Sequence, residues 1–228
     1  MQNANLIETA FNLMKFFVPF LFALCFHEFA HGLVAKWKGD RTAETMGRLT
    51  LNPAAHADPL GTVIFPIMGF LTQLPLFGWA KPVPVDERNL KNPKKDMFWI
   101  SIAGPMSNLL LAFVAMLVLT AFYYFNMTAI ASRQEGALQI EEVIHIFILL
   151  NTYLAIFNLI PVHPLDGGKV IARFLPNHVN QWLENNQMYT GIILMLIFLS
   201  GAAALIGLPA RFLSSYLVVM AHNLAFAL

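Results

Sequence analysis

Two histidines and a glutamate are spaced so that they can form a catalytic zinc site. Residues 27–31 read HEFAH, so His27 and His31 are four residues apart. On a helix, both imidazoles would face the same side and could reach one metal ion. Glu28 could then take a proton from a water molecule that the metal activates. The pattern predicts hydrolysis of a peptide bond.

This motif lies within residues 16–35, a stretch apolar enough to be buried in a lipid bilayer. Ionisable side chains inside a membrane span are costly and usually functional. A histidine pair on a soluble helix often only forms hydrogen bonds with its neighbours. Two histidines and a glutamate in a bilayer need stronger compensation, which a metal ion provides.

The composition is that of a polytopic membrane protein. Hydrophobic residues make up 57% of the chain and charged residues 12%, against about 25% charged residues in average soluble domains. The net charge of +1 and the lack of a long basic run indicate no nucleic-acid partner. Cys25 is the only cysteine, which excludes an intrachain disulfide. We expect no removable signal peptide.

We expect an all-α polytopic membrane protein with five to six transmembrane helices. A spanning helix needs about 20 mostly apolar residues, and the segments that meet this requirement are 14–36, 97–125, 140–162 and 189–208. The tail, 211–228, is either a short span or an interfacial helix. Residues 58–75 are apolar but interrupted by prolines and glycines, which disfavours a regular spanning helix.

A catalytic zinc ion normally has three protein ligands, so a third must come from elsewhere. The candidate segment is 158–168, NLIPVHPLDGG, at the end of the 140–162 span. Its prolines and glycines break the helix, and irregular backbone at membrane depth occurs only where it is buried in protein or lines a wet cavity. Asp166 can therefore turn back toward the metal.

With both motifs in view, the chain resembles the site-2 protease family of intramembrane zinc metalloproteases. The family's motifs are HExxH and N-x-x-P-x-x-x-L-D-G, and the resemblance covers roughly residues 20–175. It implies that His27, His31 and Asp166 hold one Zn²⁺ per chain and that Glu28 is the base. It also places Asn158 near the site, where it would steady the substrate or the oxyanion.

The resemblance further implies a compact bacterial-type member without a PDZ domain. Its substrate would be a membrane protein with a transmembrane helix, cut within or near that helix in the lipid bilayer, as in regulated intramembrane proteolysis. We expect one domain over 1–228, with a catalytic core at about 14–175 and C-terminal helices at about 189–228. The alternatives are a zinc-binding channel or transporter and a non-cleaving pseudoprotease, and the intact Glu28 argues against both. The sequence leaves the substrate and the oligomeric state open.

Topology follows from the need of both motifs to reach one ion at one depth. Spans 97–125 and 140–162 supply two crossings between them, so residues 58–75 cannot add a single crossing. We therefore predict a re-entrant or extended membrane-associated segment there. Most lysines and arginines fall on the motif side, which indicates an active site toward the cytoplasm of a bacterial inner membrane.

Three further histidines each have two candidate roles. His56, with Asp58, contributes to the site or is a turn histidine at the interface. His163 approaches the metal or forms a wall of the substrate site. For His145, near two glutamates, a polar group close to water is favoured over a second metal site.

Two further segments have predicted roles outside the ligand set. Ser107 and Asn108 are expected to serve helix packing through a hydrogen bond. Residues 79–85 are predicted to form an extended edge that pairs with an unwound substrate strand.

Overall fold

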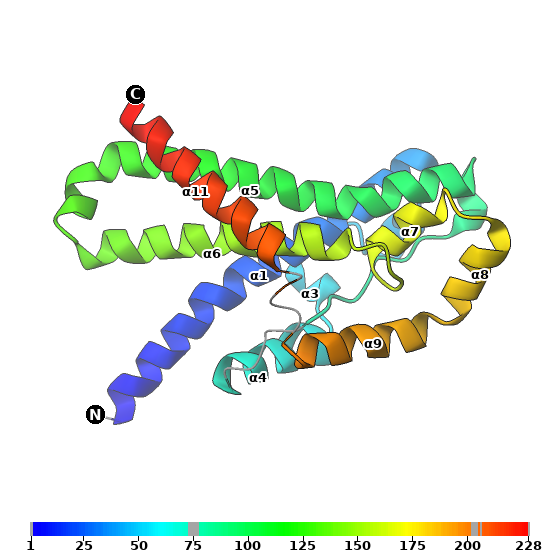
Figure 1. The fold of residues 1–228 in the computed structure, drawn as a ribbon, viewed down its shortest axis with the longest axis horizontal. Coiled ribbons are helices and arrows are strands. Elements are labelled where there is room, and N and C mark those ends of the chain that lie inside the picture. The colour runs from blue at the N-terminus through cyan, green and yellow to red at the C-terminus, as the bar shows by residue number, and fades with distance from the viewer. Residues whose placement is uncertain (1, 73–77, 202–204, 206, 228) are drawn as a thin grey trace.

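The protein is helical, as predicted. The structure, a computed structural model, describes residues 2–72, 78–201, 205 and 207–227, and no strand occurs among them (Figure 1). The long helices are α1 (Gln2–Lys38), α5 (Pro93–Ala131), α6 (Glu135–Asn158) and α11 (Leu208–Ala227). The shorter helical elements are α2 (Thr42–Thr45), α3 (Pro53–His56), η1 (Pro59–Ile64), α4 (Phe65–Thr72), η2 (Glu87–Asn89), α7 (Asp166–Ala172), α8 (Asn177–Asn185) and α9 (Gln187–Leu199).

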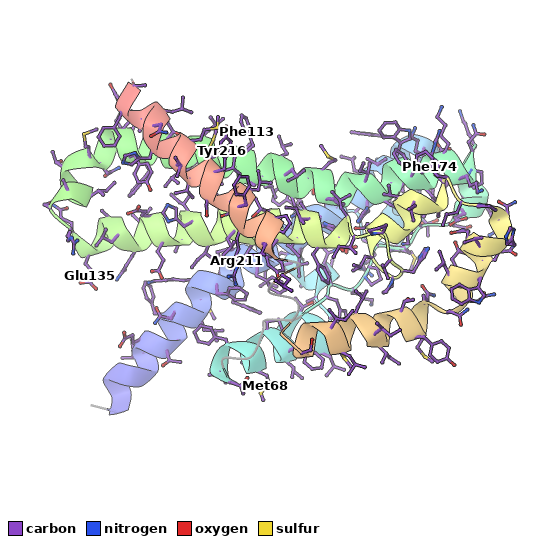
Figure 2. All side chains as sticks on the ribbon, in the orientation of Figure 1. Met68, Phe113, Glu135, Phe174, Arg211 and Tyr216 are labelled. Carbon is purple, nitrogen blue, oxygen red and sulfur yellow. The ribbon has the colours of Figure 1, made fainter. Side chains whose placement is uncertain are left out.

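Three helices are long and apolar enough to cross a membrane: Ile7–Lys38 of α1, α5 and α6. They contain the first two predicted spans and most of the third. Large apolar side chains on α5 remain exposed, among them Leu110 and Phe113, and Figure 2 shows Phe113 and Tyr216 projecting away from the bundle. So extensive an apolar surface requires lipid around it.

The predicted span over 189–208 is not a single helix. Helix α9 ends at Leu199, and Gly201 follows with a φ of 81°, in the left-handed conformation that commonly terminates helices. At 1.5 Å per residue, a helix of 13 residues is about 20 Å long, shorter than the roughly 30 Å hydrocarbon core.

Helix α11, in the predicted tail, packs across α5 and α6 (Figure 1). Ala221 and Ala225 of α11 are buried in a cluster with Met116 and Leu119 of α5 and Ile148 of α6. Small residues at such a contact allow helix backbones to approach closely. The three helices therefore form one packed unit.

The ends of α1 and α6 that carry the two motifs lie at the same end of the bundle (Figure 1). Helices α5 and α6 form a hairpin whose turn, at 132–134, lies at the opposite end. Figure 2 shows the same separation, with Glu135 at the hairpin turn and Phe174 beside α7 at the other end. This arrangement is consistent with the prediction that two membrane crossings, α5 and α6, separate the two motifs.

Asp40, directly after α1, ties the connecting segment to the end of that helix. Its buried carboxylate accepts hydrogen bonds from the N–H of Thr42, the N–H of Asp86 (2.8 Å) and the Nδ2 of Asn89 (2.9 Å). Burial raises the pKa of Asp40, but these hydrogen bonds outweigh it and hold the pKa below its usual value. The charged carboxylate therefore fixes residues 86–89 against α1.

Asp40→Ala should lower the free energy of unfolding by about 1–3 kcal/mol, because three partly buried hydrogen bonds to a charged acceptor are lost. Thermal unfolding of the purified protein in detergent measures this loss. The control Arg41→Gln removes only an exposed ion pair with Glu44 and should change little. Equal unfolding midpoints for the two variants would contradict this role of Asp40.

Residues 59–72 form a continuous helical segment, η1 followed by α4. Asp58 caps it by accepting hydrogen bonds from the N–H groups of Leu60 and Gly61. The change from π- to α-helix falls next to Pro66, which has no backbone N–H to donate. Pro59 and Pro66, two of the residues that disfavoured a regular spanning helix, thus lie at the start of this segment and at this change. Residues 73–77 of the predicted 58–75 segment lie outside the described residues.

Candidate zinc site

Three potential ligand atoms from two distant parts of the chain meet at one point. Helix α1 carries His27 and His31, and Asp166 is the first residue of α7. The two Nε2 atoms are 3.1 Å apart. The Oδ2 of Asp166 lies 3.0 Å from the Nε2 of His27 and 3.2 Å from that of His31. Within the described part of the chain, this is the one cluster of three such side chains suited to a metal.

The geometry fits zinc. Ligand atoms about 2.0–2.1 Å from a tetrahedral zinc ion are about 3.3 Å from one another, close to the separations of this triangle. Gly104 of α5 faces the same point, because a Cβ there would lie no more than 2.6 Å from the Nε2 atoms of His27 and His31. The absence of a side chain at Gly104 keeps the space beside the ligand atoms open.

Each histidine is oriented by a carbonyl oxygen on α5. The Nδ1 of His27 lies 2.6 Å from the Oδ1 of Asn108, and the Nδ1 of His31 lies 2.6 Å from the backbone oxygen of Ile100. These oxygens can only accept, so both Nδ1 atoms carry the proton and both Nε2 lone pairs remain available to a metal.

Asn108 acts beyond the helix packing predicted for it. Its Nδ2 donates to the backbone oxygen of Ala23 (3.1 Å) and to the Oδ1 of Asn151 on α6 (2.9 Å). These bonds fix the orientation of the amide and direct its oxygen at His27. Sequence reasoning missed this role, although a polar amide within an apolar span is a general signal of function; its full burial became visible only in the structure.

Asn108→Ala should weaken zinc binding about 10- to 100-fold, as is typical when the partner of a ligating histidine is lost. Competition with a chelator measures the affinity. Asn126→Ala is the matched control, because the side chain of Asn126 bonds to Phe122 of its own helix. Equal zinc affinities in the two variants would refute the orienting role.

Glu28 is buried beside the ligands and is held by the segment that follows α4. Its Oε2 accepts a hydrogen bond of 2.8 Å from the N–H of Val83. Residues 78–86 have no regular secondary structure and pass next to the HExxH helix. The predicted pairing of residues 79–85 with a substrate strand stays a prediction.

A tight turn positions Asp166. A Cβ at Gly167 would collide with the carbonyl oxygens of Leu159 and Ile160, and one at Gly168 would lie 2.6 Å from the backbone nitrogen of His163. The two glycines therefore let the turn after α6 fold directly onto the first turn of α7. This contact directs Asp166 back toward α1.

The remaining candidates have other partners. Asn158 is on the last turn of α6, and its Nδ2 donates to the backbone oxygen of Leu154, so its catalytic role stays a prediction. The Nε2 of His56 lies 2.8 Å from the backbone oxygen of Thr50. His145 contacts the hydroxyl of Tyr123 (3.1 Å). His163 lines a separate cavity.

An HExxH pair on a helix long and apolar enough to span a membrane, with the carboxylate of Asp166 beside it, has the features of a membrane zinc metalloprotease. Residues 15–200 match Peptidase family M50, and the chain belongs to this family. The resemblance to the site-2 proteases is thereby confirmed, and the protein is a zinc metalloprotease.

The chain is similar to two proteins named "Putative zinc metalloprotease". It is 37% identical to YwhC of Bacillus subtilis over 190 residues, which are 83% of this chain and 82% of YwhC. It is 26% identical to Rip2 of Mycolicibacterium smegmatis over 185 residues, which are 80% of this chain and 65% of Rip2. No solved structure matches the chain.

Proposed function

We propose that this protein is an intramembrane zinc endopeptidase that hydrolyses peptide bonds within or near transmembrane helices of membrane-protein substrates. The observation that carries the proposal is that Asp166 meets His27 and His31, and that these two histidines lie on a helix long and apolar enough to span a membrane. Family M50 supports the metalloprotease chemistry. One zinc ion per chain is proposed for this cluster.

The depth of the cluster favours cleavage within the membrane. Lys36 and Lys38 end α1, and His27 precedes Lys36 by nine residues (36 − 27). At 1.5 Å per residue this is about 14 Å along the helix. A substrate peptide bond must therefore enter below the interface, and its helix must unwind there to expose the carbonyl.

Zinc, when bound, supplies a Lewis acid that polarises the scissile carbonyl and makes a water molecule more acidic. Glu28 accepts the proton from the attacking water and passes it to the leaving amine. The N–H of Val83 holds one carboxylate oxygen of Glu28, which leaves the other oxygen for the proton. Asn158 or a backbone amide would stabilise the oxyanion.

The proposed topology makes residues 59–72 a re-entrant segment. This apolar helix of 14 residues is about 21 Å long, too short for a hydrocarbon core of about 30 Å. The chain also returns to its starting point, because the N–H of Trp79 donates to the oxygen of Gly61 (3.1 Å) and the hydroxyl of Thr62 donates to the oxygen of Trp79 (2.8 Å). Both contacts support a chain that enters and leaves the membrane on the same side.

The proposal also includes the arrangement of the whole chain. Residues 1–228 would form one domain that includes α11, because this helix packs on α5 and α6. The cationic residues near the motif end support an orientation with that end on the cytoplasmic side of a bacterial inner membrane.

Asp166→Ala should lower the zinc content at least tenfold and abolish cleavage, because the cluster loses its only carboxylate ligand. The test uses the full chain in liposomes with a reporter transmembrane helix, and measures bound zinc and the cleaved fragment. Asp58→Ala, which removes a carboxylate that caps η1, is the control and should keep zinc. Zinc transport into the liposomes without any cleaved fragment would overturn the proposal in favour of a transporter.

A further inference from the structure

A cavity of about 320 Å³ lies outside the zinc site, between the start of α5, the helices α7 and α8, and the beginning of α9. Its volume is at the small end of the range of small-molecule sites, about 300–1,000 Å³. The charged residues of its wall are Glu87, Lys94, Lys169, Arg173 and Glu184.

Charges of both signs line this cavity without forming ion pairs. The cavity has three cationic side chains, those of Lys94, Lys169 and Arg173. In the part of the chain that the structure describes, none of them forms an ion pair with Glu87 or Glu184. Arg173 instead lies 5.3 Å from the ring of Phe98, and Lys94 donates to a backbone oxygen. Opposite charges that line one cavity but do not neutralise each other suit a ligand that itself carries both charges.

Two buried polar atoms in the cavity wall also lack partners. His163 is only 3% exposed, and neither its Nε2 nor the Oδ1 of Asn180 forms a hydrogen bond. Burial lowers the pKa of His163, which favours the neutral ring. The side chain of Asn180 lies near the His163 ring, so a ligand that bonds to either atom would displace that contact and satisfy a buried atom that otherwise has no hydrogen bond.

The cavity lies at the end of the bundle where α5 begins and α7 and α8 follow the Asp166 turn. Exposed aromatic side chains surround this end, with Trp37 70%, Trp99 46%, Phe174 70% and Trp182 62% exposed, and Figure 2 shows Phe174 there. Such residues form belts at the headgroup level of membranes. The same end carries the lysines that terminate α1.

We propose that this cavity binds the headgroup of a zwitterionic aminophospholipid of the phosphatidylethanolamine type. The phosphodiester faces Lys94, Lys169 and Arg173, and the ammonium group faces Glu87 and Glu184. A bound headgroup links α5 and α8 to α7, the helix that begins with Asp166. The site is independent of the proposed cleavage reaction and is tested by binding alone.

The experiment incubates the delipidated full-length protein with phosphatidylethanolamine or phosphatidylglycerol and counts retained lipids by native mass spectrometry. We expect one phosphatidylethanolamine per chain. Lys169→Gln combined with Arg173→Gln should bind it at least tenfold more weakly, whereas Arg211→Gln, an exposed cation on α11, should not change binding. Bound zinc reports whether each variant is folded.

A second variant tests the acidic half of the cavity. Glu87→Gln combined with Glu184→Gln should reverse the preference, with weaker phosphatidylethanolamine binding and stronger phosphatidylglycerol binding. Equal retention of both lipids by the unmodified protein, or unchanged retention in both double variants, would overturn the proposal. So would equally tight binding of soluble glycerophosphoethanolamine, or displacement of the lipid by a short acidic peptide, because each would identify a different occupant.

Discussion

Glu28→Gln is expected to abolish peptide cleavage while leaving zinc bound. Glutamine keeps the size of the side chain and still offers an oxygen to the N–H of Val83, but it cannot accept the proton. Loss of a general base typically lowers the rate about 10²- to 10⁴-fold. Elemental analysis of the purified protein gives the zinc content, and cleavage of a co-expressed transmembrane reporter gives the activity.

Glu142→Gln is the matched control for this variant. Glu142 is exposed and pairs with Lys15 at 2.6 Å, away from the zinc cluster, so the variant should cleave the reporter normally. A Glu28→Gln protein that cleaves the reporter as fast as the unmodified protein would exclude Glu28 as the base.

Gly104→Ala is expected to lose both zinc and activity. The added methyl group would lie within 2.6 Å of the Nε2 atoms of both histidines, where it crowds the ligand atoms and pushes α5 away from α1. Alanine favours a helix over glycine by about 1 kcal/mol, so a weaker helix cannot explain the loss. We expect zinc affinity to fall by at least 100-fold, as measured by chelator competition.

Gly136→Ala provides the comparison for this effect. Gly136 is in the first turn of α6, and a Cβ there meets nothing within 4 Å. This variant should keep zinc and full activity. If Gly104→Ala bound zinc as tightly as Gly136→Ala, the close approach of α5 to the ligand atoms would have no role in zinc binding.

The meeting of the three proposed ligands could be predicted from the sequence because each motif is locally recognisable. His27 and His31 share a helix face by spacing alone, and Asp166 follows a helix break. Asn108 and Gly104 could not be assigned their contacts in the same way, because these depend on how α5 packs against α1. Asn108 is 81 residues from His27, and no local pattern connects them.

The fold, like the site, could be predicted from the sequence only in part. Length and apolarity were enough to predict the three spanning helices. They were not enough to place the end of α9, because the left-handed conformation of Gly201 is a property of the backbone that hydropathy does not report. The sequence predicted no regular spanning helix over residues 58–75, but it did not show where helical turns would form, because the effect of each proline depends on where it falls in a helix.

The most direct test of intramembrane cleavage compares membrane peptides from cells that carry the unmodified protein or Glu28→Gln. Quantitative mass spectrometry of the membrane fraction would identify cleaved transmembrane segments and the position of each cut. We expect at least one transmembrane helix that is cut within its apolar stretch in the first cells and accumulates intact in the second. Cuts confined to soluble segments, or identical peptides in both cells, would contradict intramembrane cleavage.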